Sequence, residues 1–180
     1  MFAAEQGHDL MRVPRAMDLT GRVHHLGKTT GARVVVLVFL GPECPISQRY
    51  VPELNRIASA HTNGVEVFGV FSAPSISRTQ AVDFAKDYAI KFPVLFDDGG
   101  PLGRWLRPTH VPEAFVLKPD GDVLYHGRID DGFAALGQPR TILQHHELRE
   151  AISAVLAGNA PRKSFAQPVG CYFEDWPESK

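Results

Sequence analysis

Residues 33–47 read RVVVLVFLGPECPIS, and this run constrains the architecture more than any other part of the chain. Its first half is apolar and β-branched without alternation, which predicts a central strand covered on both faces. A turn at Gly41-Pro42-Glu43 leads into residues 45–61, whose apolar side chains recur at helical spacing. Cys44 therefore stands at the N-terminus of a predicted helix that directly follows a buried strand.

Strand and helix patterns alternate on both sides of this run. In chain order, the other predicted elements are a hairpin around Gly21, a strand at 65–71, a helix opened by a capping box at 77–80, a strand at 92–96, a short helix near 101–106, a hairpin of 114–117 with 123–126, and a helix from about 143 to 156. This order predicts an α/β fold, with a central mixed β-sheet flanked by helices and an N-terminal β-hairpin extension. We expect one domain at 17–160, preceded by a flexible arm at 1–16 and followed by an irregular tail at 161–180.

Composition and charge exclude several classes of protein. The 180 residues are 44% hydrophobic and 22% charged, close to the globular average, and the formal net charge of −1 provides no basic field for nucleic acid. The longest apolar run, Val34–Leu40, falls far short of the roughly 20 residues that span a bilayer. The first residues lack the basic start and apolar core of a signal peptide. An extracytoplasmic location is therefore expected only if the chain has been trimmed, and a cytoplasmic one if Met1 is native.

The chain has two cysteines, Cys44 and Cys171, which are too few for a disulfide scaffold or a four-cysteine metal site. A helix N-terminus offers free N–H groups and the positive end of the helix dipole to a thiolate, so the pKa of Cys44 should fall below the free value of about 8.5. Pro45 suits the first helical turn because it has no N–H to leave unpaired. We expect the Cys44 sulfur to face outward as a nucleophile; the alternative is a buried cysteine that only packs.

Several motifs resemble a known family. The turn GPECPIS at 41–47, with Pro52 eight residues after Cys44, is similar to the active-site turn and helix-kinking proline of the thioredoxin superfamily. The segment THVP at 109–112, followed by a strand, resembles the cis-proline loop of that superfamily. The phrases PISQRYVPELNRI, HVPEAFVLKPDGDVLYHGRIDD and VGC resemble bacterial redoxin-domain proteins of the AhpC/TSA branch. The resemblance covers roughly residues 17–172 and implies a thioredoxin-like fold and a thiol-dependent oxidoreductase.

The resemblance also implies an arrangement of the site. Cys44 would be the redox nucleophile, Ser47 a neutral hydrogen-bonding neighbour, and a cis Val111-Pro112 bond would hold an extended backbone edge beside the sulfur. A disulfide, thiol or peroxide substrate would bind along that edge and near Pro45, and a thiol reductant would complete the cycle. His110 precedes the expected cis proline, where it would serve either as a proton donor to a leaving thiolate or as an ordinary surface residue.

Several positions depart from the patterns of that superfamily. Ser47 stands where thioredoxins have their second cysteine, so a local disulfide cannot form. Peroxiredoxins have a proline at the position of Leu37, a threonine or serine at that of Gly41 and an arginine at that of Pro112. Without these groups, fast peroxide reduction is not expected. Copper carriers have a second cysteine at the position of Gln48, which argues against copper handling.

Cys171 leaves three interpretations open. It could resolve oxidised Cys44, within one chain or across a homodimer, it could form a permanent structural bridge, or it could stay a free thiol. The eight histidines include two adjacent pairs whose members diverge on a strand or a helix, so we expect no metal and no cofactor.

The function expected from these patterns is that of a thiol-disulfide oxidoreductase or a peroxiredoxin-like antioxidant protein. We expect it to act as a monomer or homodimer, without nucleic-acid partners and without a membrane span. The alternative is a non-catalytic binding module on the same fold, which captures a partner by mixed disulfide or handles a metal.

Overall fold

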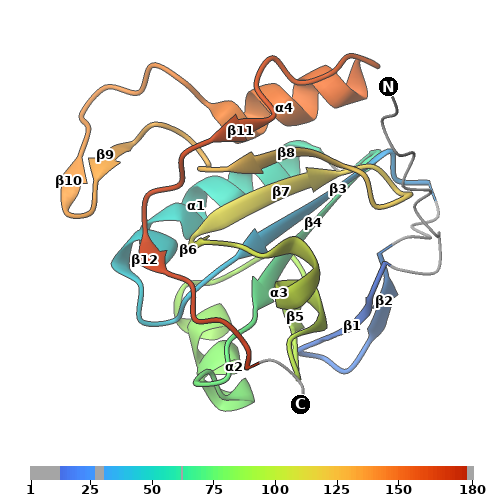
Figure 1. Ribbon diagram of the computed structural model, residues 1–180, viewed down its shortest axis with the longest axis vertical. Helices are drawn as coiled ribbons and strands as arrows, with labels where there is room; N and C mark the ends of the chain where they lie inside the picture. The colour runs from blue at the N-terminus through green and yellow to red at the C-terminus, as the bar shows by residue number, and fades with distance from the viewer. Residues whose placement is uncertain (1–12, 27–30, 62, 178–180) are drawn as a thin grey trace, which may run out of the picture.

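The computed structural model describes residues 13–26, 31–61 and 63–177 (Figure 1). Its main sheet has eight strands in the spatial order β11-β8-β7-β3-β4-β5-β1-β2. These strands are β1 (Arg15–Asp18), β2 (Val23–His25), β3 (Val34–Phe39), β4 (Val65–Phe71), β5 (Val94–Phe96), β7 (Glu113–Leu117), β8 (Val123–Gly127) and β11 (Phe165–Ala166). Two smaller ladders join β9 (Phe133–Ala135) to β10 (Gln138–Pro139) and β6 (His110–Val111) to β12 (Cys171–Tyr172). β3, β4 and β5 run parallel, whereas β7 pairs antiparallel with β3 and β8, so the main sheet is mixed.

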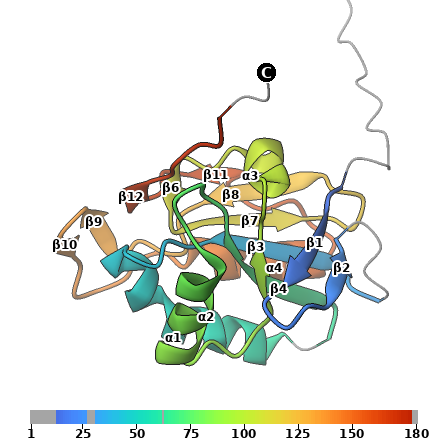
Figure 2. The ribbon, with the colours of Figure 1, turned by 90° about the horizontal axis from the view of Figure 1, so that it is seen from below.

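Helices cover both faces of this sheet. α1 (Pro45–Ala60) and α2 (Arg78–Asp87) lie on one face, and α3 (Pro101–Leu106) lies on the other (Figure 2). α4 (Glu147–Leu156) packs on β3, β7 and β8. The structure therefore confirms the predicted α/β fold with a central mixed sheet flanked by helices.

β3 lies at the centre of the core. All of its residues are buried, and Val36 lies opposite Val67 of β4 and Val116 of β7. Fully burying a side chain of this size contributes about 1.5–3 kcal/mol, so the uninterrupted apolar pattern fixes this strand in the middle of the sheet. The turn that carries Cys44 follows β3 directly, and α1 follows the turn. The position of the thiol is thus set by the best-packed part of the molecule.

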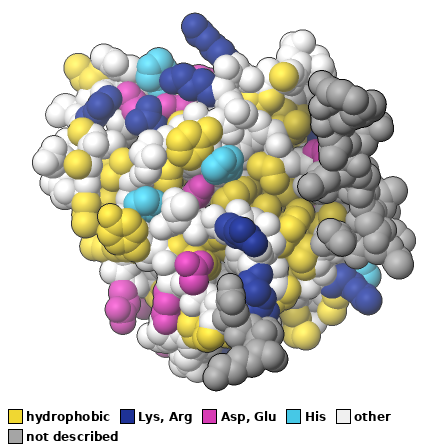
Figure 3. Space-filling model, viewed as in Figure 1, with side chains coloured by type: hydrophobic (Ala, Val, Ile, Leu, Met, Phe, Trp, Pro, Cys, Tyr) yellow, Lys and Arg dark blue, Asp and Glu magenta, His cyan; other side chains and the backbone are white. Residues whose placement is uncertain are grey.

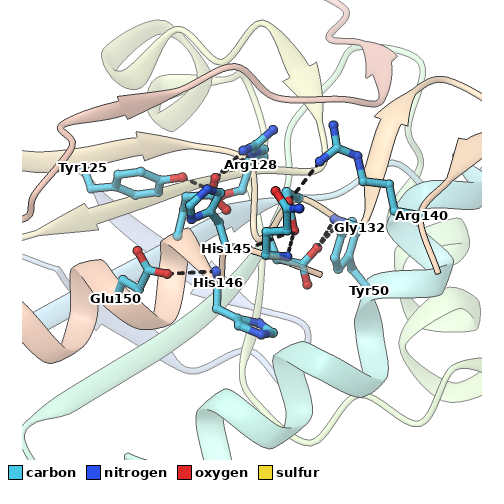
Figure 4. A network of polar contacts seen from close by, with 12 residues as sticks. Tyr50, Tyr125, Arg128, Gly132, Arg140, His145, His146 and Glu150 are labelled. Atoms are coloured by element: carbon cyan, nitrogen blue, oxygen red, sulfur yellow. Dashed lines mark hydrogen bonds and ion pairs between the residues drawn. The ribbon is translucent and has the colours of Figure 1, made fainter. Parts of the chain in front are cut away.

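A buried polar network supports α1 from the side of β9 and α4 (Figure 4). The Tyr50 hydroxyl of α1 donates a hydrogen bond to Asp130 Oδ1 (2.5 Å). The neighbouring Asp131 is fully buried and forms an ion pair with Arg140 (Oδ2 to Nη1, 3.0 Å). Because buried charges require such partners, this network fixes how the loop after β8 meets the helix that carries the thiol.

The same network explains why the last helix begins later than predicted. Asp131 Oδ1 accepts hydrogen bonds from the backbone N–H groups of Gln144 (3.0 Å) and His145 (3.2 Å). Both residues are held in a loop around the carboxylate, and α4 begins only at Glu147 rather than near residue 143. The sequence pattern could not reveal this because Asp131 is distant along the chain.

The N-terminal hairpin extends the sheet beyond β5, as predicted. β1 pairs with both β2 and β5, and Gly21 takes a positive φ of 91° in the turn. Asp18 Oδ1 accepts hydrogen bonds from the N–H groups of Thr20 (2.8 Å) and Arg22 (3.0 Å), which closes the turn. Of the expected flexible arm, residues 1–12 lie outside the described residues, whereas its last two residues belong to β1.

The chain beyond residue 161, expected to be irregular, contains two strands. β11 pairs parallel with β8 at one edge of the main sheet, and β12 pairs antiparallel with β6 outside that sheet. In Figure 1 this segment runs from β11 past the end of the sheet to β12 and on toward α3. We call residues 168–177 the C-terminal strap. Neither this strap nor the β9–β10 hairpin was predicted, because strands of two or three residues leave little periodicity in a sequence.

Candidate active site

Cys44 lies immediately before α1, as predicted. Its extended backbone (φ −84°, ψ 113°) lets Pro45 begin the helix. The preceding turn closes where the Cys44 N–H donates to the carbonyl of Gly41 (3.1 Å). Ser47 holds the same turn from the helix side, because its buried Oγ accepts a hydrogen bond from the Gly41 N–H (3.1 Å). Strand, turn and helix thus keep the thiol in one place.

The cis-proline loop meets this turn directly. The Val111-Pro112 bond is cis, as the resemblance implied. The Cys44 thiol donates a hydrogen bond to the carbonyl oxygen of Val111 (Sγ to O, 3.1 Å). Three residues named from the sequence, Cys44, Val111 and Pro112, are therefore brought together, with Pro45 exposed beside them at the start of α1.

The Cys44 side chain does not face outward, and that expectation was wrong. It is 2% exposed, because the cis-proline loop and the C-terminal strap lie over the turn. The sulfur borders a cavity of about 380 Å³, whose lining also includes Val111, Cys171 and Phe173. A reactant must therefore enter this cavity to reach the thiol.

Cys171 borders the same cavity. In β12 it pairs with Val111, the residue whose carbonyl accepts the hydrogen bond from Cys44. Both cysteines are free, so no disulfide joins them in this structure. Cys171 is partly exposed whereas Cys44 is buried. The strap therefore delivers a second thiol to the site from the far end of the sequence.

The two thiols have pKa values shifted in opposite directions. Burial raises the pKa of Cys44, but hydrogen bonds from the Cys171 thiol, from the backbone N–H groups of Ser47 and Cys171 and from the Ser47 hydroxyl outweigh burial and hold this pKa below its usual value. Burial, together with the hydrogen bond and negative charge of Cys44, raises the pKa of Cys171 to about 11. Cys44 is therefore the more readily ionised thiol of the pair.

A buried carboxylate that the sequence analysis missed shapes the cis-proline loop. Glu113 follows Pro112 and is 1% exposed, and its Oε2 accepts hydrogen bonds from the N–H groups of Thr109 (2.7 Å) and His110 (3.3 Å). Its Oε1 lies 3.1 Å from Nδ1 of His126. These contacts hold the loop in the shape that presents its backbone to Cys44. The available signal was a charged residue at the start of an otherwise apolar strand, EAFVL.

His110 lies on the outer side of this loop. Its Nδ1 is 2.9 Å from Thr109 Oγ1, and its ring packs on Tyr172 with the ring centroids 5.1 Å apart. The cavity that contains both cysteines is lined by Val111 but not by His110. The structure thus brings His110 to the strap rather than to the Cys44 sulfur.

Gly41 accounts for one departure from the peroxiredoxin pattern. A Cβ atom at this position would come within 2.8 Å of a Val111 methyl group and 3.3 Å of the Cys44 Cβ. A serine or threonine here would therefore require the Val111 side chain to shift. The close approach of loop and turn thus disfavours the hydroxyl-bearing side chain that peroxiredoxins place at this point.

No group of three or more His, Cys, Asp or Glu side chains in the described part of the chain could hold a metal ion. The helices described here all lack the length and apolarity needed to cross a membrane. Figure 3 shows acidic and basic side chains interspersed on the face that carries the strap, rather than a single basic patch.

A cysteine at the start of the helix after the central strand, set against a cis proline, defines a site of the thioredoxin-like class. Solved structures share this fold. An uncharacterised conserved protein from Geobacillus kaustophilus superimposes with a TM-score of 0.78 at 22% identity, over 93% of this chain and 92% of that one. A putative thiol:disulfide interchange protein DsbE from Chlorobium tepidum superimposes with a TM-score of 0.55 at 26% identity, over 62% of this chain and 77% of that one.

The chain belongs to the AhpC/TSA family, whose profile matches residues 11–126. It is also 28% identical over 108 residues to the thiol-disulfide oxidoreductase ResA of Bacillus thuringiensis subsp. konkukian, a match that covers 59% of this chain and 61% of that protein. The family match includes Cys44 and the cis-proline loop and ends before α4 and the strap. Cys171 is therefore a feature of this chain that the family match does not explain.

Proposed function

We propose that this protein is a thiol-disulfide oxidoreductase in which Cys44 is the nucleophile and Cys171 is the resolving cysteine. One observation carries the proposal: Cys171 pairs with Val111, whose carbonyl is hydrogen-bonded to the Cys44 thiol, so both sulfurs face one cavity. The ResA relative, a thiol-disulfide oxidoreductase by name, supports this class of chemistry.

The reaction begins when the Cys44 thiolate attacks a substrate disulfide, R–S–S–R. A bond forms between Cys44 and one substrate sulfur while the substrate S–S bond breaks, and the first RS⁻ leaves and takes up a proton. Cys171 then loses its proton to solvent and attacks the Cys44 sulfur, which expels the second RS⁻. The substrate has gained two electrons, and the chain holds a Cys44–Cys171 disulfide that an external dithiol reduces.

The pKa shifts of the two thiols explain why Cys44 reacts first and Cys171 second. Hydrogen bonds from Cys171 and Ser47 hold the pKa of Cys44 below its usual value, whereas the pKa of Cys171 is raised, so Cys44 attacks first. The charge of Cys44 is one of the causes that raise the pKa of Cys171 to about 11. Once Cys44 is part of a mixed disulfide, that charge is gone, and Cys171 ionises more readily at the stage at which it must attack.

Peroxide is a poor substrate in this proposal. Peroxidases of this family stabilise the peroxide oxygens with a hydroxyl and a guanidinium, and removing such groups costs several kcal/mol of transition-state stabilisation. Gly41 and Pro112 occupy the corresponding positions here, and a larger side chain at position 41 would have to displace the Val111 methyl group. Any oxidation of Cys44 by peroxide should therefore be slow.

Mass spectrometry of the reduced protein after one equivalent of a small disulfide tests the proposal. The wild type should lose two hydrogens and yield a peptide pair linked through Cys44 and Cys171. Cys171→Ser should stop at the mixed disulfide on Cys44, and Cys44→Ser should leave its remaining thiol unmodified. A wild-type protein that stops at a mixed disulfide would contradict the resolving step and favour a module that captures partners without turnover.

A further inference from the structure

The C-terminal strap occupies the backbone edge on which an extended peptide would dock in this class of site. β12 forms an antiparallel ladder with β6, in which Cys171 pairs with Val111 and Tyr172 with His110. The ladder continues where the Phe173 N–H donates to the carbonyl of Thr109 (2.9 Å). Strand addition is a common way to bind an extended peptide, and here the chain's own tail has taken that place.

The strap lies directly on the loop, which leaves no room for a second strand between them. A Cβ atom on Gly170 would come within 2.1 Å of the Val111 carbonyl oxygen and 3.1 Å of the Pro112 nitrogen. Only a residue without a side chain allows the two backbones to approach this closely. The placement of Gly170 beside Cys171 is therefore a requirement of this docked position.

Beyond the ladder, aromatic side chains anchor the strap. The ring of Phe173 packs edge-on against Phe39 of the core strand, with centroids 5.8 Å apart. Further along, Trp176 Nε1 donates to Ser72 Oγ (3.1 Å), and its indole lies so close to Gly100 that a Cβ there would come within 2.1 Å of the ring. Ser72 in turn donates to the buried Asp97 (2.6 Å). The strap is thus held at both ends and in its middle.

The remaining access to the sulfur suits a small molecule. The cavity of about 380 Å³ falls in the range of small-molecule sites, about 300–1,000 Å³. Two carboxylates border it, Glu43 and Glu174, and its lining contains no lysine or arginine. Glu174 is fixed there by a hydrogen bond from the Ser75 hydroxyl. A cavity with this charge attracts cations and repels anions, an effect that salt screens.

We infer that the strap closes the peptide edge, so that the oxidised substrate of Cys44 is a small cationic or neutral disulfide that enters through this cavity. The inference rests on the proposed disulfide exchange at Cys44. The covalent steps are those already written, with R a small group: the substrate disulfide gains two electrons and leaves as two thiols, and Cys44 and Cys171 become a disulfide. Protein disulfides react only through the minor population in which the strap has opened.

Initial rates of Cys44 modification test this inference, with cystamine as a cationic disulfide, oxidised glutathione as an anionic one and insulin as a protein disulfide. An open state populated at about 10% or less lowers the insulin rate at least about tenfold relative to cystamine. Trp176→Ala releases the far anchor and should raise the insulin rate about tenfold while the cystamine rate stays within about twofold. Asp175→Ala, at an exposed position of the same strap, is the matched control and should change neither rate.

A second variant and a salt series complete the test. Gly170→Val should raise the insulin rate as Trp176→Ala does, by displacing the ladder rather than the anchor.

Cystamine should react about tenfold faster than oxidised glutathione at low salt, and the preference should vanish near 1 M salt, where the Debye length is about 3 Å. Glu43→Gln with Glu174→Gln should remove the same preference without added salt.

The possible failures can be told apart. Equal wild-type rates with insulin and cystamine, or an insulin rate that neither strap variant raises, would overturn the closed peptide edge. Equal rates with the two small disulfides at low salt would overturn the selection by charge. A wild-type Cys44 that reacts with none of the three disulfides would overturn the proposed function itself and this inference with it.

Discussion

Cys44 and Cys171 face the same cavity from two different kinds of structure. Cys44 follows a fully buried strand and precedes a sixteen-residue helix, and the hydroxyl of Ser47 closes the turn that carries it. Cys171 belongs to a two-residue strand outside the main sheet, held by one short ladder and two aromatic side chains. The turn that carries Cys44 is thus fixed by the core, whereas the strap that carries Cys171 packs on the outside of it.

The difference matches what each thiol has to do. A nucleophile gains from hydrogen bonds and a helix N-terminus that stabilise its charge in one position, and such groups must be held rigidly. A resolving thiol has to approach a sulfur that is bonded to a substrate, and then withdraw when the disulfide is reduced. A segment with few buried contacts opens at lower free energy than the core, so it can make this movement.

Removing each thiol in turn gives the largest expected effects and tests the comparison most directly. Cys44→Ser should lower the rate of disulfide reduction at least about 10⁴-fold, because the remaining thiol at the cavity, Cys171, lacks the hydrogen bonds that lower the pKa of Cys44. Cys171→Ser should slow the first attack only as far as the lost Cys171 hydrogen bond raises the pKa of Cys44. It should lower steady-state turnover about 10²-fold, because an intramolecular attack is replaced by one from solution. Stopped-flow and steady-state assays separate the two steps. If both variants lost the first step equally, the division of tasks between the two regions would be wrong.

A smaller effect tests how the Ser47 hydroxyl, which closes the turn before α1, lowers the pKa of Cys44. Ser47→Ala removes a hydrogen bond that lowers the pKa of Cys44, so that pKa should rise. The thiolate forms above this pKa, and the alkylation rate of Cys44 should therefore reach its midpoint at higher pH and fall about fivefold at pH 7. Iodoacetamide kinetics between pH 5 and 10 measure the midpoint.

Ser59→Ala is the matched control for that variant, because the Ser59 hydroxyl belongs to the same helix and bonds only the Asn55 carbonyl among the described residues. Its pH profile should coincide with that of the wild type. A Ser47→Ala profile that also coincided would show that the Ser47 hydroxyl does not contribute to the lowered pKa of Cys44.

The smallest expected effect concerns the mobility of the two regions in the resting protein. The Phe173 N–H, bonded to Thr109, should exchange with solvent at least about 10²-fold faster than the amides of β3, because it needs only the strap to open. Oxidation to the Cys44–Cys171 disulfide should slow the Phe173 exchange and leave β3 unchanged. Hydrogen exchange followed by NMR measures both. Equal protection in the reduced protein would mean that the strap belongs to the core.

The same contrast explains how much could be predicted from the sequence. The cis proline at position 112 was expected from the resemblance of its loop to that of the thioredoxin superfamily, since most X-Pro bonds are trans. β3 and the helix that starts after Cys44 were predicted because each has a strong local signal: an apolar run and a proline at the first helical turn. The capping box of Ser77 and Gln80 was confirmed for the same reason. Elements whose residues determine their own conformation can be recognised without knowledge of the rest of the fold.

The strap and the burial of Cys44 could not be predicted in this way. β12 exists because Gly170 has no side chain, because Phe173 contacts Phe39 and because Trp176 lies against Gly100, and these partners are distant in sequence. No periodicity over two residues reveals such pairing. In retrospect, the signals were a glycine directly before Cys171 and three aromatic residues, Tyr172, Phe173 and Trp176, in the short polar segment that follows.

Because Trp176 contacts α3 only when the strap is docked, its fluorescence can report whether the strap is open or closed. The chain has only two tryptophans, and Trp105 lies on α3 rather than on the strap. In the docked strap the indole of Trp176 rests on a glycine backbone and is hydrogen-bonded to Ser72. Release of the strap into water would shift the emission of Trp176 to longer wavelength. In a variant with Trp105 replaced, the fluorescence spectrum of the unlabelled protein would therefore report opening of the strap.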